Sequence, residues 1–324
     1  MMSRRNWFLV AAIGLTALIV LWSFVGGWYG SGPLAKDTHF IVPNGASLAT
    51  VADRLEKQGM IRSATGFTLR ARVFGAGSEI KAGEFAIPAH ASASRVMAII
   101  SSDDVIRRFV TVPEGMPAIM VQERLMAQPQ LTGDIAVPDE GSVLPDSYSY
   151  GNGESRQDVL RRMQAAMSRT LAELWDKRDD GLVVKTPEQA IILASIVEKE
   201  TGKPSERRMV AGLYSNRLRI GMPLQADPTI IYPITRGKAL GRRILQSEIR
   251  AVNDYNTYSM AGLPKYPITN PGKASIEAVL HPAKTGALYM VADGTGGHAF
   301  ASTLAEHNEN VKKWFAIRRS RGEI

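Results

Sequence analysis

The chain has no cysteine among its 324 residues, which excludes disulfide cross-links, cysteine-based zinc sites and thiol catalysis. Histidine is also scarce, with five residues, and the spacings of His281, His298 and His307 match no metal-ligand pattern. The sequence therefore predicts no metal ion and no cofactor. Hydrophobic residues make up 45% of the chain and charged residues 22%, a composition typical of one large folded domain or two to three ordinary ones.

The net charge of +8 is unevenly distributed along the chain. Residues 1–36 contribute +3 to this net charge and residues 311–324 contribute +4, so residues 37–310 are close to neutral. A nucleic-acid-binding face needs basic residues gathered over the folded body. The distribution therefore argues against nucleic acid as a partner, while the role of the basic C-terminal tail stays open.

The chain has one long hydrophobic run, residues 7–28, which carries no charged side chain. As a helix it would extend ~33 Å, enough to cross a hydrocarbon core of ~30 Å. Trp7 and Trp28 stand at its two ends, where the aromatic belts of membrane helices lie. The run therefore predicts a transmembrane helix, and no later stretch is long and apolar enough to be a second one.

The residues before this run set its expected orientation. Arg4 and Arg5 precede it, so the positive-inside rule places residues 1–6 in the cytoplasm. We expect a single-pass protein of the cytoplasmic (inner) membrane, with a Gly-containing linker at 29–37 and the bulk of the chain periplasmic. A cleaved signal peptide is the alternative, but it needs a shorter apolar run that ends in small residues, whereas this run ends in bulky aromatic ones.

Two segments of different size follow the linker. Residues 38–112 predict a small α+β subdomain with no catalytic constellation, with strands expected at 39–42, 85–87 and 105–112 and helices at 47–58, 67–74 and 94–101. Residues 113–324 predict a larger mixed domain, with helices expected at 116–127, 155–177, 187–200 and 205–220, a hairpin at 287–302 and a last helix from 304. The polar stretch 132–155 predicts a long functional or disordered loop.

The helix expected after Thr186 carries a carboxyl group on its apolar side. Thr186 suits the N-cap position and Pro187 the first helical position. At 100° per residue, Glu200 falls about 20° from Leu193, within the apolar stripe, whereas Glu198 falls about 140° away. Glu200 is therefore the first candidate for a buried acid, and Glu198 is a secondary acid candidate.

A carboxyl group among apolar neighbours loses hydration, which disfavours its charged form and raises its pKa. Such a group stays protonated near neutral pH and can act as a general acid. The alternative is structural, because Glu200 lies in the last helical turn, where it could reach solvent or pair with Arg207 or Arg217. The helix alone leaves both interpretations open.

Several turn-rich segments after this helix are polar and aromatic. Flat aromatic faces and paired donors and acceptors are what a sugar-binding groove needs. Ordinary turn chemistry explains the Asp-Pro and Asn-Pro pairs equally well. The polar residues singled out in these segments are Gln225, Asp227, Tyr232, Asn256 and His298.

Taken together, the motifs resemble the YceG-like endolytic murein transglycosylases, the MltG family. The similar segments are VPEGM (112–116), LPDSY (144–148), ASIVEKET (194–201), SERRMVAGLYSNRLRIGMPLQADPTIIY (205–232), YNTY (255–258), GLP (262–264), NPG (270–272), HPAKTGALYMVADGTGGHAF (281–300) and HN (307–308). The resemblance implies an α+β protein with one transmembrane helix, a LysM-like subdomain at 38–112 and a mixed α/β catalytic domain at 113–324. Leu144 departs from the pattern, because a related chain more usually has Trp or Phe there.

The resemblance implies an activity and a catalytic residue. Family members cleave the β-1,4 bond between N-acetylmuramic acid and N-acetylglucosamine within peptidoglycan strands and leave 1,6-anhydro-muramyl ends. Their catalytic glutamate is the second acid of an E-K-E-T motif, which maps onto Glu200. The resemblance also suggests peptidoglycan synthases as partners. Five further residues match family positions and are expected to bind substrate or stabilise an intermediate: Gln225, Asp227, Tyr232, Asn256 and His298.

Other functions remain open from the sequence. A non-catalytic, membrane-anchored peptidoglycan-binding protein would need the groove but not Glu200. A water-using muramidase would need a second carboxylate beside Glu200, for which Asp227 is a candidate. A serine hydrolase built from Ser195, His298 and Asp227 fits poorly, because Ser195 lies inside a helix without the sharp turn that exposes such a nucleophile.

Overall fold

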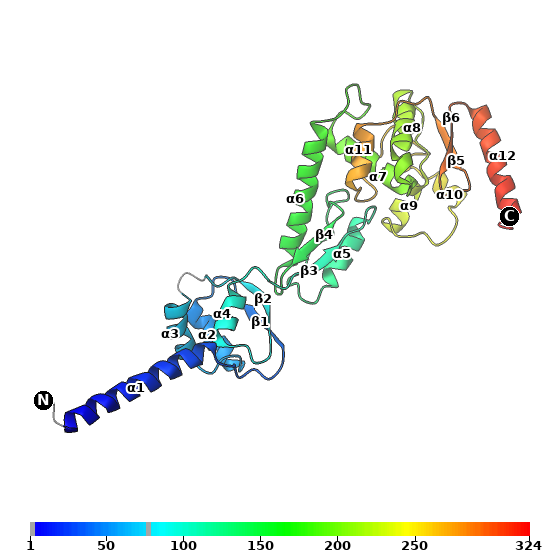
Figure 1. Ribbon diagram of the computed structural model, residues 1–324. Helices are drawn as coiled ribbons and strands as arrows, with labels where there is room; N and C mark the ends of the chain where they lie inside the picture. Colours follow the sequence, from blue (N-terminus) through cyan, green and yellow to red (C-terminus); the bar gives the residue numbers. More distant parts are fainter. Residues whose placement is uncertain (1–3, 76–78) are drawn as a thin grey trace. The chain divides into compact units, whose positions relative to one another are not determined.

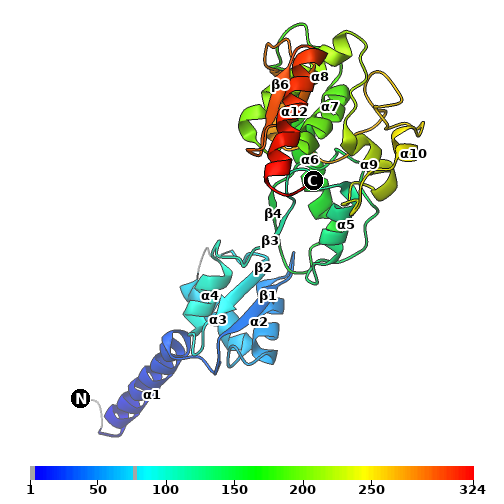
Figure 2. The same ribbon diagram turned by 90° about the vertical axis from the view of Figure 1, so that its right-hand side faces the viewer.

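The computed structural model describes residues 4–75 and 79–324 and divides the chain into two compact units. Unit 1 comprises the residues up to Arg108 together with Tyr150–Gly153, and unit 2 comprises Phe109–Ser149 and Glu154–Ile324. Both contain helices and short strands (Figures 1 and 2), so the predicted α+β class is confirmed. Residues 1–3 of the predicted cytoplasmic N-terminus lie outside the described residues.

Unit 1 combines a long N-terminal helix with a two-stranded sheet and three shorter helices (Figure 1). Its elements are α1 (Arg4–Tyr29), β1 (Thr38–Val42), α2 (Leu48–Lys57), α3 (Ala64–Phe74), β2 (Gly83–Ile87) and α4 (Ala93–Ile100). Strands β1 and β2 pair antiparallel, with Thr38 opposite Ile87 and Val42 opposite Gly83. Within α1, Asn6–Tyr29 is long and apolar enough to cross a membrane, as the sequence predicted.

The far end of α1 belongs to the core of unit 1. Trp28 is 3% exposed and packs among the buried side chains of α2, α3 and β2, with its ring centroid 5.8 Å from that of Phe67. An indole enclosed by protein cannot lie in the aromatic belt of a bilayer, so the expectation that Trp28 marks the membrane edge is wrong. The sequence pattern of a membrane helix does not show which of its residues a folded domain covers.

The segment after α1 is attached to unit 1 rather than free. Leu34 is buried in the core, and the backbone N–H of His90 donates to the carbonyl of Leu34 at 2.8 Å. The N–H of Gly32 donates to the carbonyl of His90 at 3.1 Å. The glycines in this segment, which suggested a linker, permit close backbone approach, since a Cβ at Gly32 would lie 2.0 Å from the carbonyl oxygen of Ala91.

The remaining elements are mostly helices, with two further two-stranded sheets (Figure 2). They are β3 (Arg108–Thr111), α5 (Ala118–Met126), β4 (Ser147–Tyr150), α6 (Arg156–Trp175), α7 (Pro187–Glu200), the 3₁₀ helix η1 (Pro204–Glu206), α8 (Arg207–Arg219), α9 (Asp227–Thr235), α10 (Gln246–Ile249), α11 (Lys273–Leu280), β5 (Tyr289–Ala292), β6 (His298–Ala301) and α12 (Leu304–Ser320). Strand β3 pairs with β4, and β5 pairs antiparallel with β6.

Strand β4 and the helices α9, α10 and α11 were not predicted from the sequence. Strand β4 lies inside the stretch 132–155, which was expected to be a loop, because its short polar sequence becomes a strand only by pairing with β3. Helix α9 begins at Asp227, where Asp227-Pro228 was interpreted as a turn. Acidic residues and proline are both favoured in the first helical turn, so the same pair fits a helix start equally well.

Helix α7 is the centre of unit 2. Its residues Leu193, Ile196 and Val197 are fully buried and pack against side chains of α8 and α11. The side chain of Thr186 accepts a hydrogen bond from the N–H of Gln189, as expected for an N-cap. Because α7 is packed against other helices over most of its length, the position of its last residue, Glu200, is fixed.

Candidate active site

Glu200 lines a cavity of about 240 Å³ in unit 2. Although the residue as a whole keeps some exposure, its Oε1 is shut off from solvent and has no hydrogen-bond partner among the described residues. Burial raises the pKa of the Glu200 carboxyl to about 7, and the negative charge of Asp227 also raises it. A hydrogen bond from Tyr214 and the positive charge of Arg217 lower the pKa of Glu200 and so offset part of this rise. The arrangement holds a proton on Glu200 near neutral pH.

Asp227 lies at the start of α9 and lines the same cavity. The hydroxyl of Tyr258 donates to Asp227 Oδ1 at 2.6 Å, which orients the carboxylate. Burial raises the pKa of Tyr258, as does its bond to Asp227, so this phenol remains a donor. The structure thus brings a second carboxyl group to Glu200, one that is more exposed and already has a hydrogen-bond donor.

Arg217, on α8, places a cation beside Glu200. It is 7% exposed, and its Nε donates to the carbonyl of Leu288 at 2.7 Å while its Nη1 donates to the carbonyls of Leu224 at 2.7 Å and Pro223 at 3.2 Å. Burial lowers the pKa of Arg217. Because these bonds go to backbone carbonyls, the charge of Arg217 is not cancelled by a carboxylate and acts on the cavity. The same bonds join α8 to two later segments of the chain, at residues 223–224 and at Leu288.

Gln225 and His298 complete the cavity wall. Gln225 has a left-handed backbone with φ of 54°, and its N–H donates to the carbonyl of Thr257 at 3.1 Å. This conformation is costly for a residue other than glycine and persists only where its surroundings impose it. His298 Nδ1 lies 2.8 Å from Glu206 Oε2, and its backbone N–H donates to Glu206 Oε1 at 3.1 Å. One ring nitrogen of His298 is therefore engaged by Glu206.

Tyr232 and Asn256, predicted to bind substrate, do not line the Glu200 cavity. Asn256 is fully buried, and its Nδ2 donates to backbone carbonyls around α10, the shortest being that of Ala251 at 2.6 Å. Its Oδ1 accepts from the N–H of Tyr258 at 3.0 Å. Asn256 therefore stabilises the loop that positions Tyr258 at the cavity and does not face the cavity itself.

Tyr232 lines a different cavity of about 350 Å³, together with Glu140 and Tyr255. Its hydroxyl donates to Glu140 Oε2 at 3.0 Å, and Glu140 Oε1 accepts from the N–H of Ala118 at the start of α5. Burial raises the pKa of Glu140 to about 7, as it does for Glu200. Glu140 differs in having both oxygens bonded, which indicates a structural group at a helix start.

Glu198 occupies a structural position away from the cavity. Its Oε2 accepts from the N–H of Gly272 at 2.9 Å, and its Oε1 lies 3.8 Å from a guanidinium nitrogen of Arg207. The two acids of α7 therefore have different surroundings. Glu198 is paired with backbone and cation, whereas Glu200 keeps an unpaired oxygen at a cavity.

Among the polar residues of the cavity, sequence reasoning missed Tyr214 and Tyr258, and it named Arg217 only as a structural partner of Glu200. Tyr214 and Arg217 are three residues apart and share one face of α8, a spacing that the sequence displays. Tyr258 stands in the YNTY motif, in which Asn256 drew attention instead. Ser195 is fully buried and bonded to the backbone of Ile192 and Ile268, so it offers no nucleophile.

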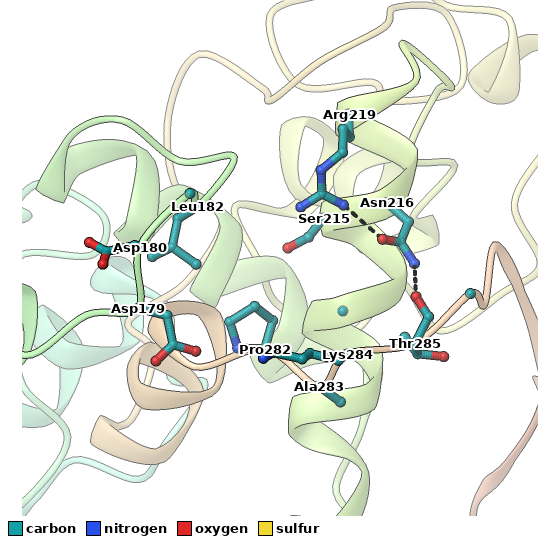
Figure 3. A pocket seen from close by; sticks show the side chains of 13 residues that line it. Asp179, Asp180, Leu182, Ser215, Asn216, Arg219, Pro282, Ala283, Lys284 and Thr285 are labelled. Atoms are coloured by element: carbon teal, nitrogen blue, oxygen red, sulfur yellow. Dashed lines mark hydrogen bonds between the residues drawn. The ribbon is translucent and has the colours of Figure 1, made fainter.

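A larger cavity of about 760 Å³ lies on the opposite face of α8 (Figure 3). Ser215, Asn216 and Arg219 line it from α8, with Arg219 donating to Asn216 Oδ1 at 2.9 Å. It shares no lining residue with the Glu200 cavity. Substitutions on the two faces of α8 can therefore be compared to test which of the two cavities is needed for activity.

Comparison with known proteins gives one consistent family. The YceG-like family model matches residues 40–313. The endolytic murein transglycosylase of Bacillus subtilis is 27% identical over 94% of this chain and 93% of its own length. That of Streptococcus pneumoniae D39 is 26% identical over 83% of this chain, which spans 57% of the relative's length.

A solved structure supports the fold. The crystal structure of a putative YceG-like protein from Listeria monocytogenes aligns with a TM-score of 0.53, covering 85% of this chain and 98% of that one at 24% identity. The cavity around Glu200, Tyr214 and Arg217 falls within the residues that the family model matches. The chain belongs to the YceG-like family.

Proposed function

We propose that this protein is a membrane-anchored endolytic lytic transglycosylase, which cleaves the bond between N-acetylmuramic acid and N-acetylglucosamine within peptidoglycan strands and leaves 1,6-anhydro ends. The observation that carries this proposal is the Glu200 carboxyl, with an unpaired, solvent-shielded Oε1 at a cavity. The names of the curated relatives, both endolytic murein transglycosylases, support it.

The first step uses Glu200 as a general acid. With its pKa near 7, Glu200 is about half protonated at neutral pH and largely protonated below it, and it donates this proton to the glycosidic oxygen as the C1–O bond breaks. Positive charge develops on C1 and the ring oxygen of the muramyl residue. The negative charge of Asp227 favours this charge and also keeps the proton on Glu200 beforehand.

The second step uses the same group as a base. The Glu200 carboxylate takes the proton of the muramyl 6-hydroxyl while that oxygen bonds to C1 and closes the anhydro ring. Glu200 is then protonated again, and no water is consumed. Arg217 favours the carboxylate form of Glu200 that exists between the two steps. Tyr214 favours it too, by hydrogen bonding.

The N-terminal part of the chain supports the membrane part of the proposal. Helix α1 is long and apolar enough to cross a membrane once, and we place the N-terminus in the cytoplasm by the positive-inside rule. The order β1–α2–α3–β2, with an antiparallel strand pair, supports a LysM-like subdomain that binds glycan. A subdomain attached directly to α1 would hold glycan strands near the membrane.

The pH dependence of kcat/KM tests the acid step. Because protonated Glu200 is required, activity should fall about tenfold per pH unit above pH about 7, whereas an ordinary carboxyl would place this fall near 4.5. The folded protein also binds more protons than the unfolded chain between pH 4.5 and 7, so stability should decline as pH rises through that window. The profile is measured with soluble glycan strands over pH 4–9.

Glu140→Gln is the control for this profile, because Glu140 has a similarly raised pKa but lies at another cavity. This variant should keep the fall in activity near pH 7 while losing part of the pH dependence of stability. If the fall in activity disappears in Glu140→Gln, or lies near pH 4.5 in the unaltered protein, Glu200 is not the titrating acid.

A water-using muramidase is the alternative function, which the names of the curated relatives do not favour. It would use Asp227, which lines the same cavity. Asp227 could deprotonate a water molecule at C1 while Glu200 protonates the leaving oxygen, as in two-carboxylate glycosidases. The bond from Tyr258 to Asp227 weighs against this role, because it occupies one oxygen of the carboxylate that would have to take the proton of the water. The products of the two reactions differ by one water molecule per cleavage.

A further inference from the structure

The end of α1 and helix α3 are packed together in unit 1 (Figure 1). The ring of Phe74, the last residue of α3, has its centroid 5.6 Å from that of Phe24 and 5.9 Å from that of Tyr29. The Nε of Arg70 donates to the carbonyl of Phe24 at 2.9 Å. Helix α3 is therefore fixed to a segment of α1 that lies within the apolar span Asn6–Tyr29.

The position of Phe24 along α1 sets the depth of this contact. The helix from Asn6 to Phe24 is about 28 Å long, close to the ~30 Å thickness of a hydrocarbon core. If α1 crosses a bilayer, Phe24 lies at the boundary between acyl chains and headgroups, and Trp28 lies beyond it in the protein core. Whatever contacts Phe24 from α3 must lie at the same depth.

The side of α3 that faces away from the protein core carries two exposed apolar side chains. Leu69 and Val73, four residues apart, are 53% and 57% exposed, whereas Phe67 and Ala71 on the opposite side are buried in the core of unit 1. A stripe of this kind on a water-exposed helix would cost hydration free energy. Next to the stripe, the exposed Arg72 is suited to anionic headgroups.

We propose that α3 is an interfacial membrane helix, with Leu69, Val73 and Phe74 inserted among the acyl chains at the boundary that Phe24 marks. The inference rests on the proposed membrane anchor and adds a second membrane contact to it. The occupant of the apolar stripe is lipid, because the stripe is continuous with the membrane-spanning surface of α1 through the Phe24–Phe74 contact. Two helices fixed to each other at this depth hold unit 1 against the bilayer rather than at the end of a tether.

The absence of cysteine allows a direct test with full-length protein. Single cysteines are introduced as Leu18→Cys, Val73→Cys and Ala49→Cys, each at an exposed position of α1, α3 or α2, and are labelled with an environment-sensitive fluorophore. The proteins are reconstituted in vesicles of phosphatidylethanolamine and phosphatidylglycerol, with and without lipids that carry a quencher along the acyl chain. Leu69→Cys serves as a second position on the stripe.

Labels at Leu18, Val73 and Leu69 should emit at shorter wavelength and lose intensity with the lipid quencher, while the label at Ala49 should do neither. A quenched Leu18 label with water-exposed labels at Val73 and Leu69 would overturn the interfacial helix and leave the anchor intact. Labels at Val73 and Leu69 that are shielded from water but not quenched would show a protein partner instead. A Leu18 label in water would overturn the anchor, and this inference with it.

Discussion

Replacing Glu200 with glutamine is expected to lower kcat on purified peptidoglycan by a factor on the order of 10³, with little change in folding. Glutamine keeps the shape of the side chain but has no proton to donate and cannot accept one afterwards. Since the unpaired Oε1 of Glu200 makes no structural bond among the described residues, its loss should not cost stability. Release of soluble fragments from purified sacculi measures the rate, and thermal unfolding measures the stability.

Glu198→Gln is the matched variant for this result, because it removes the other acid of the same helical turn. Glu198 accepts a bond from Gly272 and lies near Arg207, so this change should weaken folding modestly and leave the rate within a few-fold of the original. Digestion by Glu200→Gln at the original rate, or a larger loss of activity in Glu198→Gln than in Glu200→Gln, would contradict the assignment of Glu200 as the acid.

Arg217→Met should have the second largest effect, on both stability and pH dependence. Methionine fills similar space but leaves the carbonyls of Leu224 and Leu288 without their donor, which should lower the free energy of unfolding by about 3 kcal/mol. Because Arg217 lowers the pKa of Glu200, its removal should also move the fall in kcat/KM to a pH above 7. Chemical denaturation and a pH–rate profile measure the two effects.

Arg219→Met is the control on the opposite face of α8, where the side chain is exposed and lines the larger cavity. It should change the free energy of unfolding by no more than about 0.5 kcal/mol and leave the pH profile unchanged. A pH profile that stays in place in Arg217→Met would show that its charge does not act on Glu200, whatever the loss of stability.

The local pattern of the sequence predicted the base of the site correctly. The N-cap at Thr186, the apolar stripe of α7 and the position of Glu200 on that stripe depend only on residues near one another in the chain. The same holds for the last helix, which was expected from residue 304: α12 starts there, with a capping box formed by Thr303 and Glu306. Periodicity and capping depend on nearby residues, so they predict a helix correctly where the packing of the core favours the same helix.

The partners of Glu200 could not be predicted in this way, because they come from distant segments. Tyr214 and Arg217 from α8, Tyr258 from a loop and His298 from β6 meet only in the folded unit. A match to a family motif also does not show whether a side chain lines the cavity or lies elsewhere in the fold. Asn256 and Tyr232 match the family as well as Asp227 does, yet Asn256 holds a loop and Tyr232 bonds Glu140 elsewhere.

The N-terminal part of the chain shows a different limit. Hydropathy predicted the long apolar helix α1, but the burial of Trp28 and the attachment of Leu34 depend on the packing of unit 1. The sequence of α3 contains the exposed Leu69 and Val73 beside the buried Phe67 and Ala71, so hydrophobicity alone does not reveal which side meets the core. Only the burial of Phe67 and Ala71 in the folded unit distinguishes the two sides.

The most direct test of the account is mass analysis of the ends that the full-length protein produces from purified sacculi in ¹⁸O-labelled water. Glu200 acting first as acid and then as base, with the muramyl 6-hydroxyl as nucleophile, predicts 1,6-anhydro-muramyl ends with no ¹⁸O incorporated. Reducing muramyl ends that are heavier by one labelled water would contradict it and assign Asp227 the role of activating water.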